Sequence, residues 1–275
     1  MSLTIFYIMI HVLFPVHKRL NSKVIMRSLS DFSQPELERL KNKTIFFGHQ
    51  SVGYNIIQGI QDIDSRMSLH LNIMETKNCN MVKTPVLAHA AIGQNKNPKS
   101  KIEEFKILIE NGFWEKADIV LAKLCYVDII LESDVKEIFN YYCEVIDNLK
   151  SQFPVINVVH VTVPLCGLPF KIKGIVKQCI KRLIGYSSIL RDNIVREQYN
   201  ELLREKYSGK EPLFDLALYE SLGPDGMQHY GFWKGQEFPV LVKSYTDDGG
   251  HLNKTGRRYV SEQLLITLLN LAGSK

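Results

Sequence analysis

The sequence predicts an α/β fold of three layers (α/β/α), in which helices cover both faces of a parallel sheet of about five strands. Short runs of β-branched residues alternate with longer segments whose apolar residues recur every three or four positions. The 275 residues are 45% hydrophobic and 23% charged, which is ordinary for a globular protein that buries a core without disulfides. We therefore expect residues 31–275 to form a single domain.

The predicted strands are short, and the most distinctive of them is 155–163 (VINVVHVTV). This segment is β-branched nearly throughout, which is typical of a strand that is covered on both faces. We expect its His160 to point into the core. The full set of predicted strands is 43–47, 118–124, 155–163 and 212–216, and a further apolar stretch occupies 84–87.

The predicted helices follow the strands in turn. The segment 53–63 carries isoleucines at helical spacing, and Pro154 ends the long amphipathic segment 134–153. The full set of predicted helices is 53–63, 101–111, 134–153, 191–207 and 255–269. In such alternating folds, active sites lie at the carboxyl ends of the parallel strands, so the reactive residues are expected directly after the strands.

Composition narrows the classes of function. The net charge of +5 is only mildly basic, and no nucleic-acid-binding motif accompanies it, so we expect no nucleic-acid partner. The five cysteines form no C-x-x-C pair, which argues against a zinc site or a disulfide framework and weakly favours a reducing compartment. These cysteines are Cys79, Cys125, Cys143, Cys166 and Cys179.

Residues 1–30 contain an apolar run from Leu3 to Val16, interrupted by His11. The run is shorter than the roughly 20 residues that cross a bilayer, and it lacks the basic start of a signal peptide. A short anchor, an unremoved leader and an extension packed on the domain all remain open. Localisation is correspondingly open between the cytoplasm and a membrane-associated or secreted state.

The segment 170–186 alternates basic and apolar residues, inside a predicted insertion that spans 166–190. A basic amphipathic helix at this place could form a lid over a substrate or contact an anionic membrane surface. The simpler alternative is a covering helix whose charged face lies in water.

Ser51 is the first candidate catalytic residue, because it follows the strand predicted at 43–47 on a tight strand-to-helix turn. The backbone amides at the start of the next helix could hold the oxyanion of a tetrahedral intermediate. Gly48 and Gly53 would relieve crowding in such a turn. The alternative is that Ser51 only caps the helix.

The second candidate is the pair Asp248 and His251, separated by two glycines. This spacing lets the carboxylate turn back to the imidazole, orient it and stabilise its protonated form. Asp247 is a rival for the same role, but the spacing favours Asp248. The alternative is a solvated loop in which Asn253 or Thr255 caps the following helix.

A third segment of interest is the loop 88–95, which follows the apolar stretch 84–87. Its Gly93 could bring a second backbone amide to the oxyanion, although loops commonly contain glycine for turn geometry alone. Asp128 follows the strand predicted at 118–124 and is expected to anchor the loops around the site.

Together these segments resemble the SGNH hydrolases, a group that includes GDSL lipases and carbohydrate acetylesterases. Ser51, Gly93 and the pair Asp248/His251 match the family's blocks in order, over about residues 43–270. The serine block is similar to a divergent branch with the pattern H-x-S-x-G. The resemblance implies a flavodoxin-like sheet and ester hydrolysis through an acyl-serine intermediate, without a metal or an organic cofactor.

The third family block departs from the pattern. Val127 stands where the family has an asparagine that donates to the oxyanion, and valine has no donor. Gln50, Asn95 and Lys123 are candidates for the missing donor. His49, next to the serine turn, is expected to hydrogen-bond behind the site rather than to act on the substrate.

The leading hypothesis is therefore a serine esterase that acts on a small-molecule or glycan ester. A glycan is suggested by the aromatic loop at 229–233, which contains Trp233, although that loop could equally plug the core. The alternatives are a catalytically weak SGNH-like binding module, which Val127 favours, and an O-acyltransferase that uses the same residues.

Overall fold

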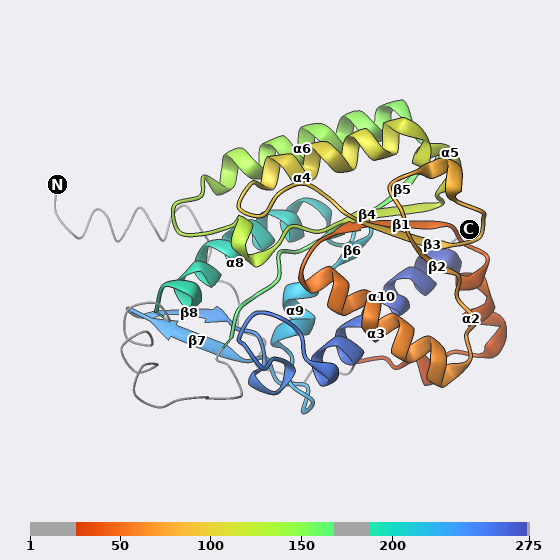
Figure 1. Ribbon diagram of the computed structural model, residues 1–275. Coiled ribbons are helices and arrows are strands. Elements are labelled where there is room, and N and C mark those ends of the chain that lie inside the picture. The colour runs from red at the N-terminus through yellow and green to blue at the C-terminus, as the bar shows by residue number, and fades with distance from the viewer. Residues whose placement is uncertain (1–25, 168–186, 274–275) are drawn as a thin grey trace.

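The computed structural model describes residues 26–167 and 187–273 and confirms the predicted three-layer α/β/α fold (Figure 1). One sheet is entirely parallel, with the strand order β2-β3-β1-β4-β5-β6. It has six strands, one more than predicted. Their bounds are β1 (Ile45–His49), β2 (Ile73–Glu75), β3 (Leu87–Ala91), β4 (Ile119–Ala122), β5 (Asn157–Val161) and β6 (Leu213–Phe214).

The strand that the sequence did not predict is β2, at one edge of the sheet. It has only three residues, and none of them is fully buried. Such a short, half-exposed strand has too little apolar periodicity to be predicted, and its pairing with β3 defines it instead.

Helices cover the two faces of the sheet and form two separate cores (Figure 1). One core contains α2 (Gln34–Lys41), α3 (Val52–Met67), α9 (Leu216–Ser221) and α10 (Lys254–Gly273), and the other contains α4 (Pro98–Leu108), α6 (Val135–Gln152) and α8 (Ser187–Tyr207). In β1, Ile45 and Phe47 enter the first core and Phe46 enters the second. Burial on both faces explains why these strands are mostly apolar.

Shorter elements complete the described chain. The predicted helix 101–111 ends as α4 and continues into a π-helical turn, where Gly112 adopts a φ of +120°. The remaining short elements are η1 (Leu29–Asp31), η2 (Cys79–Met81), η3 (Ile109–Phe113), α5 (Trp114–Lys116), η4 (Tyr126–Asp128) and η6 (Lys243–Tyr245).

The aromatic loop at 229–233 forms an antiparallel hairpin of β7 (Tyr230–Trp233) and β8 (Gln236–Pro239). Phe232 is 69% exposed, so this residue does not plug the core. The guanidinium of Arg191 lies 5.1 Å from the ring centroid of Trp233. The hairpin adjoins the segment after β5, because the Leu241 N–H donates to the Cys166 carbonyl.

His160 lies fully buried in β5, as the strand pattern predicted. Its ring stacks on Tyr207 and contacts the Tyr142 hydroxyl at 2.7 Å and the Glu211 carboxylate at 3.1 Å. Burial lowers the pKa of His160 to about 4, although Glu211 opposes this. His160 therefore belongs to the core and not to a reactive site.

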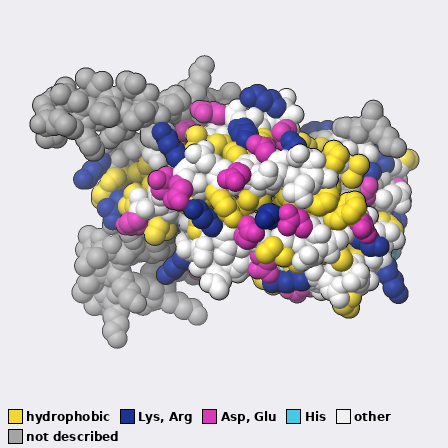
Figure 2. Space-filling model, turned by 90° about the horizontal axis from the view of Figure 1, so that it is seen from above, with side chains coloured by type: hydrophobic (Ala, Val, Ile, Leu, Met, Phe, Trp, Pro, Cys, Tyr) yellow, Lys and Arg dark blue, Asp and Glu magenta, His cyan; other side chains and the backbone are white. Residues whose placement is uncertain are grey.

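Two sequence predictions lie wholly or largely outside the described residues. These are the apolar segment 1–30, of which only residues from 26 onward are described, and the lid or membrane contact at 170–186 within 166–190. Among the helices that the structure describes, none has the length and apolarity to cross a bilayer. The face formed by α4 and α6 mixes basic and acidic side chains and presents no single-sign field (Figure 2).

The register of the central strands aligns their carboxyl ends. His49 at the end of β1 pairs with Ala91 at the end of β3, and Gly48 pairs with Ala122 at the end of β4. The loops that follow these three strands therefore meet at one edge of the sheet.

Close packing of α3 against α10 depends on Gly59. A Cβ atom at this position would lie 2.2 Å from the Ser261 Oγ and 2.4 Å from the Arg257 carbonyl oxygen. We expect Gly59→Ala to lower the free energy of unfolding by about 1–3 kcal/mol, because the helices must separate. Urea denaturation measures this, with the exposed α3 position Ser65→Ala as the control. A midpoint for Gly59→Ala equal to that of the control would contradict the prediction.

Candidate active site

Ser51 lies on the turn between β1 and α3, with φ 52° and ψ −110°. A positive φ is costly for a residue with a side chain, and such strain often occurs at reactive positions. The turn is also tight, since a Cβ at Gly53 would lie 2.3 Å from the His49 Cβ. Ser51 occupies the cap position of α3, but its hydroxyl makes no capping hydrogen bond.

The Ser51 hydroxyl instead contacts His251, which lies 200 positions later in the chain. Ser51 Oγ and His251 Nε2 are 2.8 Å apart, and His251 Nδ1 is 2.7 Å from Asp248 Oδ2. The structure thus brings the three predicted residues together in a Ser-His-Asp arrangement, and the carboxylate on His251 is that of Asp248. This geometry suits proton transfer from the serine to the imidazole.

The Asp248 carboxylate is held by several donors. Its Oδ1 accepts from the backbone N–H groups of Gly250 and His251, each at 2.8 Å, and from the Thr246 hydroxyl at 3.3 Å. Partial burial disfavours the charged carboxylate, but these amides and the His251 ring outweigh it and lower the pKa of Asp248. The group therefore stays ionised and keeps the imidazole oriented.

Three contacts fix the loop that carries His251. Within the loop, the Gly249 N–H donates to Thr246 Oγ1. From the segment after β5, the Gly167 N–H donates to the Gly249 carbonyl. On the side of α3, the Leu252 N–H donates to Asn55 Oδ1. Neither Asn55 nor Thr246 was predicted from the sequence as a positioning residue. Asn55 lies one helical turn after Ser51, which is the spacing that could have revealed it.

The loop after β3 does not place the Gly93 amide as predicted. The Gly93 N–H donates to Glu104 Oε2 at 2.6 Å, so the donor predicted for the oxyanion is engaged. The side-chain amide of Gln50 donates to the carbonyls of Ile92 and Gly93, at 2.7 and 2.5 Å. Gln50 therefore joins this loop to the serine turn rather than presenting its N–H groups to a substrate.

His49 and Lys123 lie behind the site. His49 is fully buried and contacts His89 through Nε2 at 3.1 Å; burial, with Lys123 and His89 contributing, lowers its pKa to about 2. The Lys123 ammonium is also buried and donates to the Leu124 carbonyl and Cys125 Sγ, so it does not serve as the predicted oxyanion donor. Neither residue is placed to contact a substrate.

Asn95 and Asp128 belong to a second polar group at this edge of the sheet. Asn95 is exposed, and its Oδ1 accepts from the Lys101 ammonium at 2.8 Å. Asp128 is buried and accepts from the same ammonium at 2.5 Å. Asp128 thereby anchors the loops that follow β3 and β4, as expected from the sequence.

Tyr126, next to Val127, contacts the triad from the loop after β4. Its ring centroid is 5.9 Å from that of His251, and a Cβ at Gly250 would lie 2.9 Å from the Tyr126 hydroxyl. Burial raises the pKa of Tyr126 to about 12, so the phenol remains protonated. The buried Arg196 holds the loop, because its Nε donates to the Tyr126 carbonyl at 2.8 Å.

Comparison with solved structures places this arrangement in a known fold. A protein from Streptococcus pneumonia, provisionally described as a platelet activating factor, superposes over 97% of this chain and 100% of its own, with a TM-score of 0.50 and 14% identity. The strand order, the serine after β1 and the D-x-x-H before α10 agree with the expected pattern. The chain shares the α/β/α fold of that protein.

Two further solved structures are similar at lower TM-scores. A lipase/acylhydrolase from Enterococcus faecalis covers 83% of this chain and 96% of its own, at 13% identity and a TM-score of 0.46. An acetyl xylan esterase covers 81% and 97%, at 20% identity and a TM-score of 0.41. No family model and no curated protein matches the sequence.

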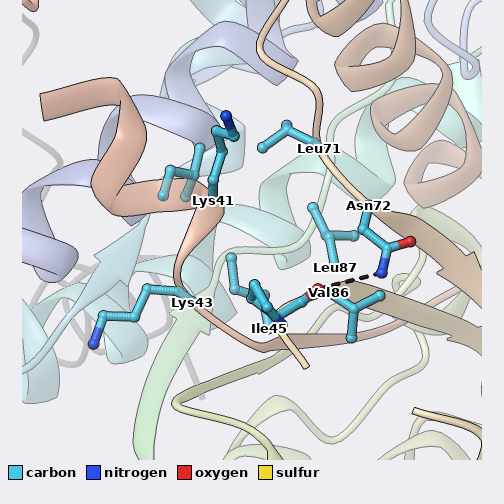
Figure 3. Close-up of a pocket in the computed structure, with 9 residues that line it drawn as sticks. Lys41, Lys43, Ile45, Leu71, Asn72, Val86 and Leu87 are labelled. Carbon is cyan, nitrogen blue, oxygen red and sulfur yellow. Dashed lines mark hydrogen bonds between the residues drawn. The ribbon is translucent and has the colours of Figure 1, made fainter. Parts of the chain in front are cut away.

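One hollow of the described structure lies away from the triad. The hollow in Figure 3 is lined by Ile45 and Leu87, the first residues of β1 and β3, so it lies at the opposite edge of the sheet. Among the described residues, no three His, Cys, Asp or Glu side chains are grouped as metal ligands would be.

Glu220 is an uncommon buried carboxylate near the loop after β5. Its Oε2 accepts from the Leu165 N–H at 2.6 Å, and its Oε1 has no partner among the described residues. Burial raises the pKa of Glu220 to about 8, although the Leu165 amide, Lys123 and Arg196 oppose this. The folded protein therefore binds a proton here that the unfolded chain has already released at neutral pH.

The Glu220 proton predicts a change of stability with pH. A carboxyl group with a raised pKa stabilises the folded state at acidic pH, and this contribution is lost as the pH rises from about 4.5 to about 8. We expect Glu220→Gln to show a smaller decline in the free energy of unfolding over this range than the wild type. Urea midpoints at several pH values test this, with the exposed Glu115→Gln as control. Identical slopes in wild type and Glu220→Gln would contradict it.

The hydrogen bond from Ser51 to His251 predicts selective reactivity. We expect a fluorophosphonate probe to label the wild type and not Ser51→Ala, because among the serines that the structure describes only Ser51 has an imidazole to accept its proton. Ser68→Ala is the matched control, since Ser68 also has a positive φ (51°) but lies at the far end of α3. Labelling of Ser51→Ala at the wild-type level, measured by intact mass, would refute the assignment.

Proposed function

We propose that this protein is a serine-dependent ester hydrolase in which Ser51 is the nucleophile. The observation that carries the proposal is the unbroken hydrogen-bond series from Ser51 Oγ through the His251 ring to Asp248. The SGNH hydrolase fold supports it, because the series lies at the carboxyl ends of parallel strands, where α/β folds place their active sites.

In the first step, Ser51 Oγ attacks the ester carbonyl while His251 Nε2 accepts the hydroxyl proton. The carbonyl oxygen becomes an oxyanion, and Asp248 stabilises the imidazolium. When the tetrahedral intermediate collapses, the bond to the alcohol oxygen breaks and His251 returns the proton to that oxygen. The alcohol leaves, and the acyl group remains on Ser51.

In the second step, water attacks the acyl-serine and His251 accepts one of its protons. Collapse of this intermediate releases the acid and returns the proton to Ser51 Oγ. The side chains of His251 and Asp248 are 45% and 59% exposed, so water reaches the triad readily. This exposure favours hydrolysis over transfer to another alcohol, which requires that water be excluded.

The N-terminus of α3 provides the first stabilisation of the oxyanion. The Ser51 N–H has no acceptor among the described residues and lies at the positive end of a 16-residue helix. Such an amide, beside the nucleophile, is placed to receive the developing charge.

We propose an acylated carbohydrate as the substrate class. The support is the β7–β8 hairpin, which adjoins the loop after β5 and carries the exposed Phe232 and the Arg191-paired Trp233. Aromatic side chains can pack on the apolar faces of sugar rings through the same dispersion forces that favour other aromatic contacts. The rate of cleavage of acetylated sugars should therefore exceed the rate of cleavage of aryl acetates that have equal chemical reactivity.

Substitution of the triad tests the mechanism. We expect Ser51→Ala to abolish ester cleavage and Asp248→Asn to lower kcat by about 10⁴-fold, because the imidazole loses its orienting carboxylate. Steady-state rates on acetylated sugars and short-chain aryl esters measure this. Asp247→Asn is the matched control and should stay close to wild type. Unchanged turnover in Ser51→Ala would show that Ser51 is not the nucleophile.

The same screen separates the alternative functions. A binding module would give neither turnover nor fluorophosphonate labelling, whereas an O-acyltransferase would give an acylated sugar when a sugar acceptor is added. We expect free acid as the main product in both the presence and the absence of the acceptor.

A further inference from the structure

The oxyanion site has fewer donors than the SGNH pattern implies. Val127 replaces the asparagine of the third block, and the Gly93 N–H is bound to Glu104. Loss of one donor typically lowers kcat by about 10²–10³-fold, so an active enzyme needs a replacement. The side chains of Gln50 and Lys123 are excluded, because they donate to backbone carbonyls and to Cys125.

Asn95 is the remaining side-chain amide among the predicted donors. Its Oδ1 accepts from Lys101 Nζ at 2.8 Å, and its NH₂ group has no acceptor among the described residues. A carboxamide held by its oxygen directs its two N–H groups away from that anchor. Asn95 is exposed and can thus meet a substrate, unlike Lys123.

The backbone around Asn95 is tied to the serine turn on both sides. On the upstream side, the Gln50 side chain donates to the carbonyls of Ile92 and Gly93.

On the downstream side, the Lys96 N–H donates to Asp128 Oδ1 at 2.8 Å. The other oxygen of this carboxylate, Oδ2, accepts from the Cys125 N–H at 2.6 Å. Cys125 Sγ in turn lies 3.7 Å from the Gln50 carbonyl oxygen. The Asn95 loop is therefore fixed beside the residue that precedes the nucleophile.

Lys101 and Asp128 form a buried ion pair beneath this loop. Both side chains are completely inaccessible to solvent, and the ammonium lies 2.5 Å from Asp128 Oδ2. A pair of this kind contributes little net stability compared with apolar side chains, but it specifies one arrangement of the groups that it contacts. Here, Lys101 uses a second N–H to fix the Asn95 carboxamide.

We propose that the Asn95 side-chain N–H stabilises the oxyanion in place of the asparagine that Val127 replaces, with Lys101 and Asp128 as its positioning residues. This inference rests on the proposed ester hydrolysis. Asn95 approaches from the loop after β3, whereas Val127 belongs to the loop after β4. The donor thus comes from the same edge of the sheet but from the other side of β1, because β1 lies between β3 and β4.

The rival donor is the Tyr126 hydroxyl, which also has no hydrogen-bond partner among the described residues. It lies against Gly250 on the His251 side of the nucleophile. Asn95 lies on the side of Gln50 and Gly93, which is where the SGNH pattern places its glycine donor. The geometry therefore favours Asn95 for the oxyanion.

Asn95→Asp is the decisive variant, because it keeps an oxygen for Lys101 and removes both N–H donors. We expect kcat on a short-chain aryl ester to fall by about 10²–10³-fold with KM within about twofold, since the donor acts in the transition state. Gln94→Glu adds the same charge at the adjacent exposed position and should stay close to wild type. Tyr126→Phe tests the rival donor, and its loss in kcat should be much smaller than that of Asn95→Asp.

The positioning role has its own test. Lys101→Met combined with Asp128→Asn removes the ion pair without leaving one charge unpaired. In that background, Asn95→Asp should lower kcat by less than about tenfold, because Lys101 no longer holds the Asn95 carboxamide in place. If Asn95→Asp costs the same factor in both backgrounds, Lys101 and Asp128 are structural only.

The outcomes separate the two proposals. The oxyanion assignment is wrong if Asn95→Asp keeps kcat within about twofold while Ser51→Ala is inactive. It is also wrong if Tyr126→Phe shows the large loss in kcat instead. In both cases the proposed ester hydrolysis still stands. If Ser51→Ala retains wild-type turnover, the proposed function itself fails. Circular dichroism and urea midpoints confirm that each variant is folded.

Discussion

The hydrogen bond between Ser51 Oγ and His251 Nε2 joins the first and last thirds of the chain, and the site depends on it. It can form only because β1 and the loop before α10 end at the same edge of one parallel sheet. The strained φ of Ser51 and the tight turn at Gly53 direct the hydroxyl outward at that edge. Parallel topology therefore creates the site, and the turn orients it.

Buried polar contacts hold the loops that the sheet brings together. Asp128 and Lys101 fix the loops after β3 and β4, and Arg196 holds the backbone of Tyr126. Asn55 ties α3 to the His251 loop. Such contacts cost desolvation and add little net stability, but each one excludes alternative loop positions. The precision of the triad therefore comes from polar contacts that surround it and that no single motif contains.

The sequence predicted the main strands and helices because their apolar periodicity reflects burial against the sheet. It predicted the segment around β5 well, since a doubly covered strand is β-branched almost throughout. It missed β2, whose three residues are half-exposed and paired only at one edge. It predicted that Ser51, Asp248 and His251 form one group, because Asp248 and His251 are related by local spacing and Ser51 follows a parallel strand, but it misjudged the donors Gly93, Gln50 and Lys123.

The donors that were predicted wrongly show the difference between what the sequence determines and what only the tertiary structure determines. The sequence by itself determined the α/β class, the edge at which the reactive side chains gather, and the pairing of Asp248 with His251 across two glycines. Only the tertiary structure decided which N–H groups are free, because the partner of Gly93 lies on α4 and the partners of Gln50 lie on the loop after β3. Hydrogen-bond satisfaction depends on contacts between distant segments, whereas periodicity and spacing are local properties of the chain.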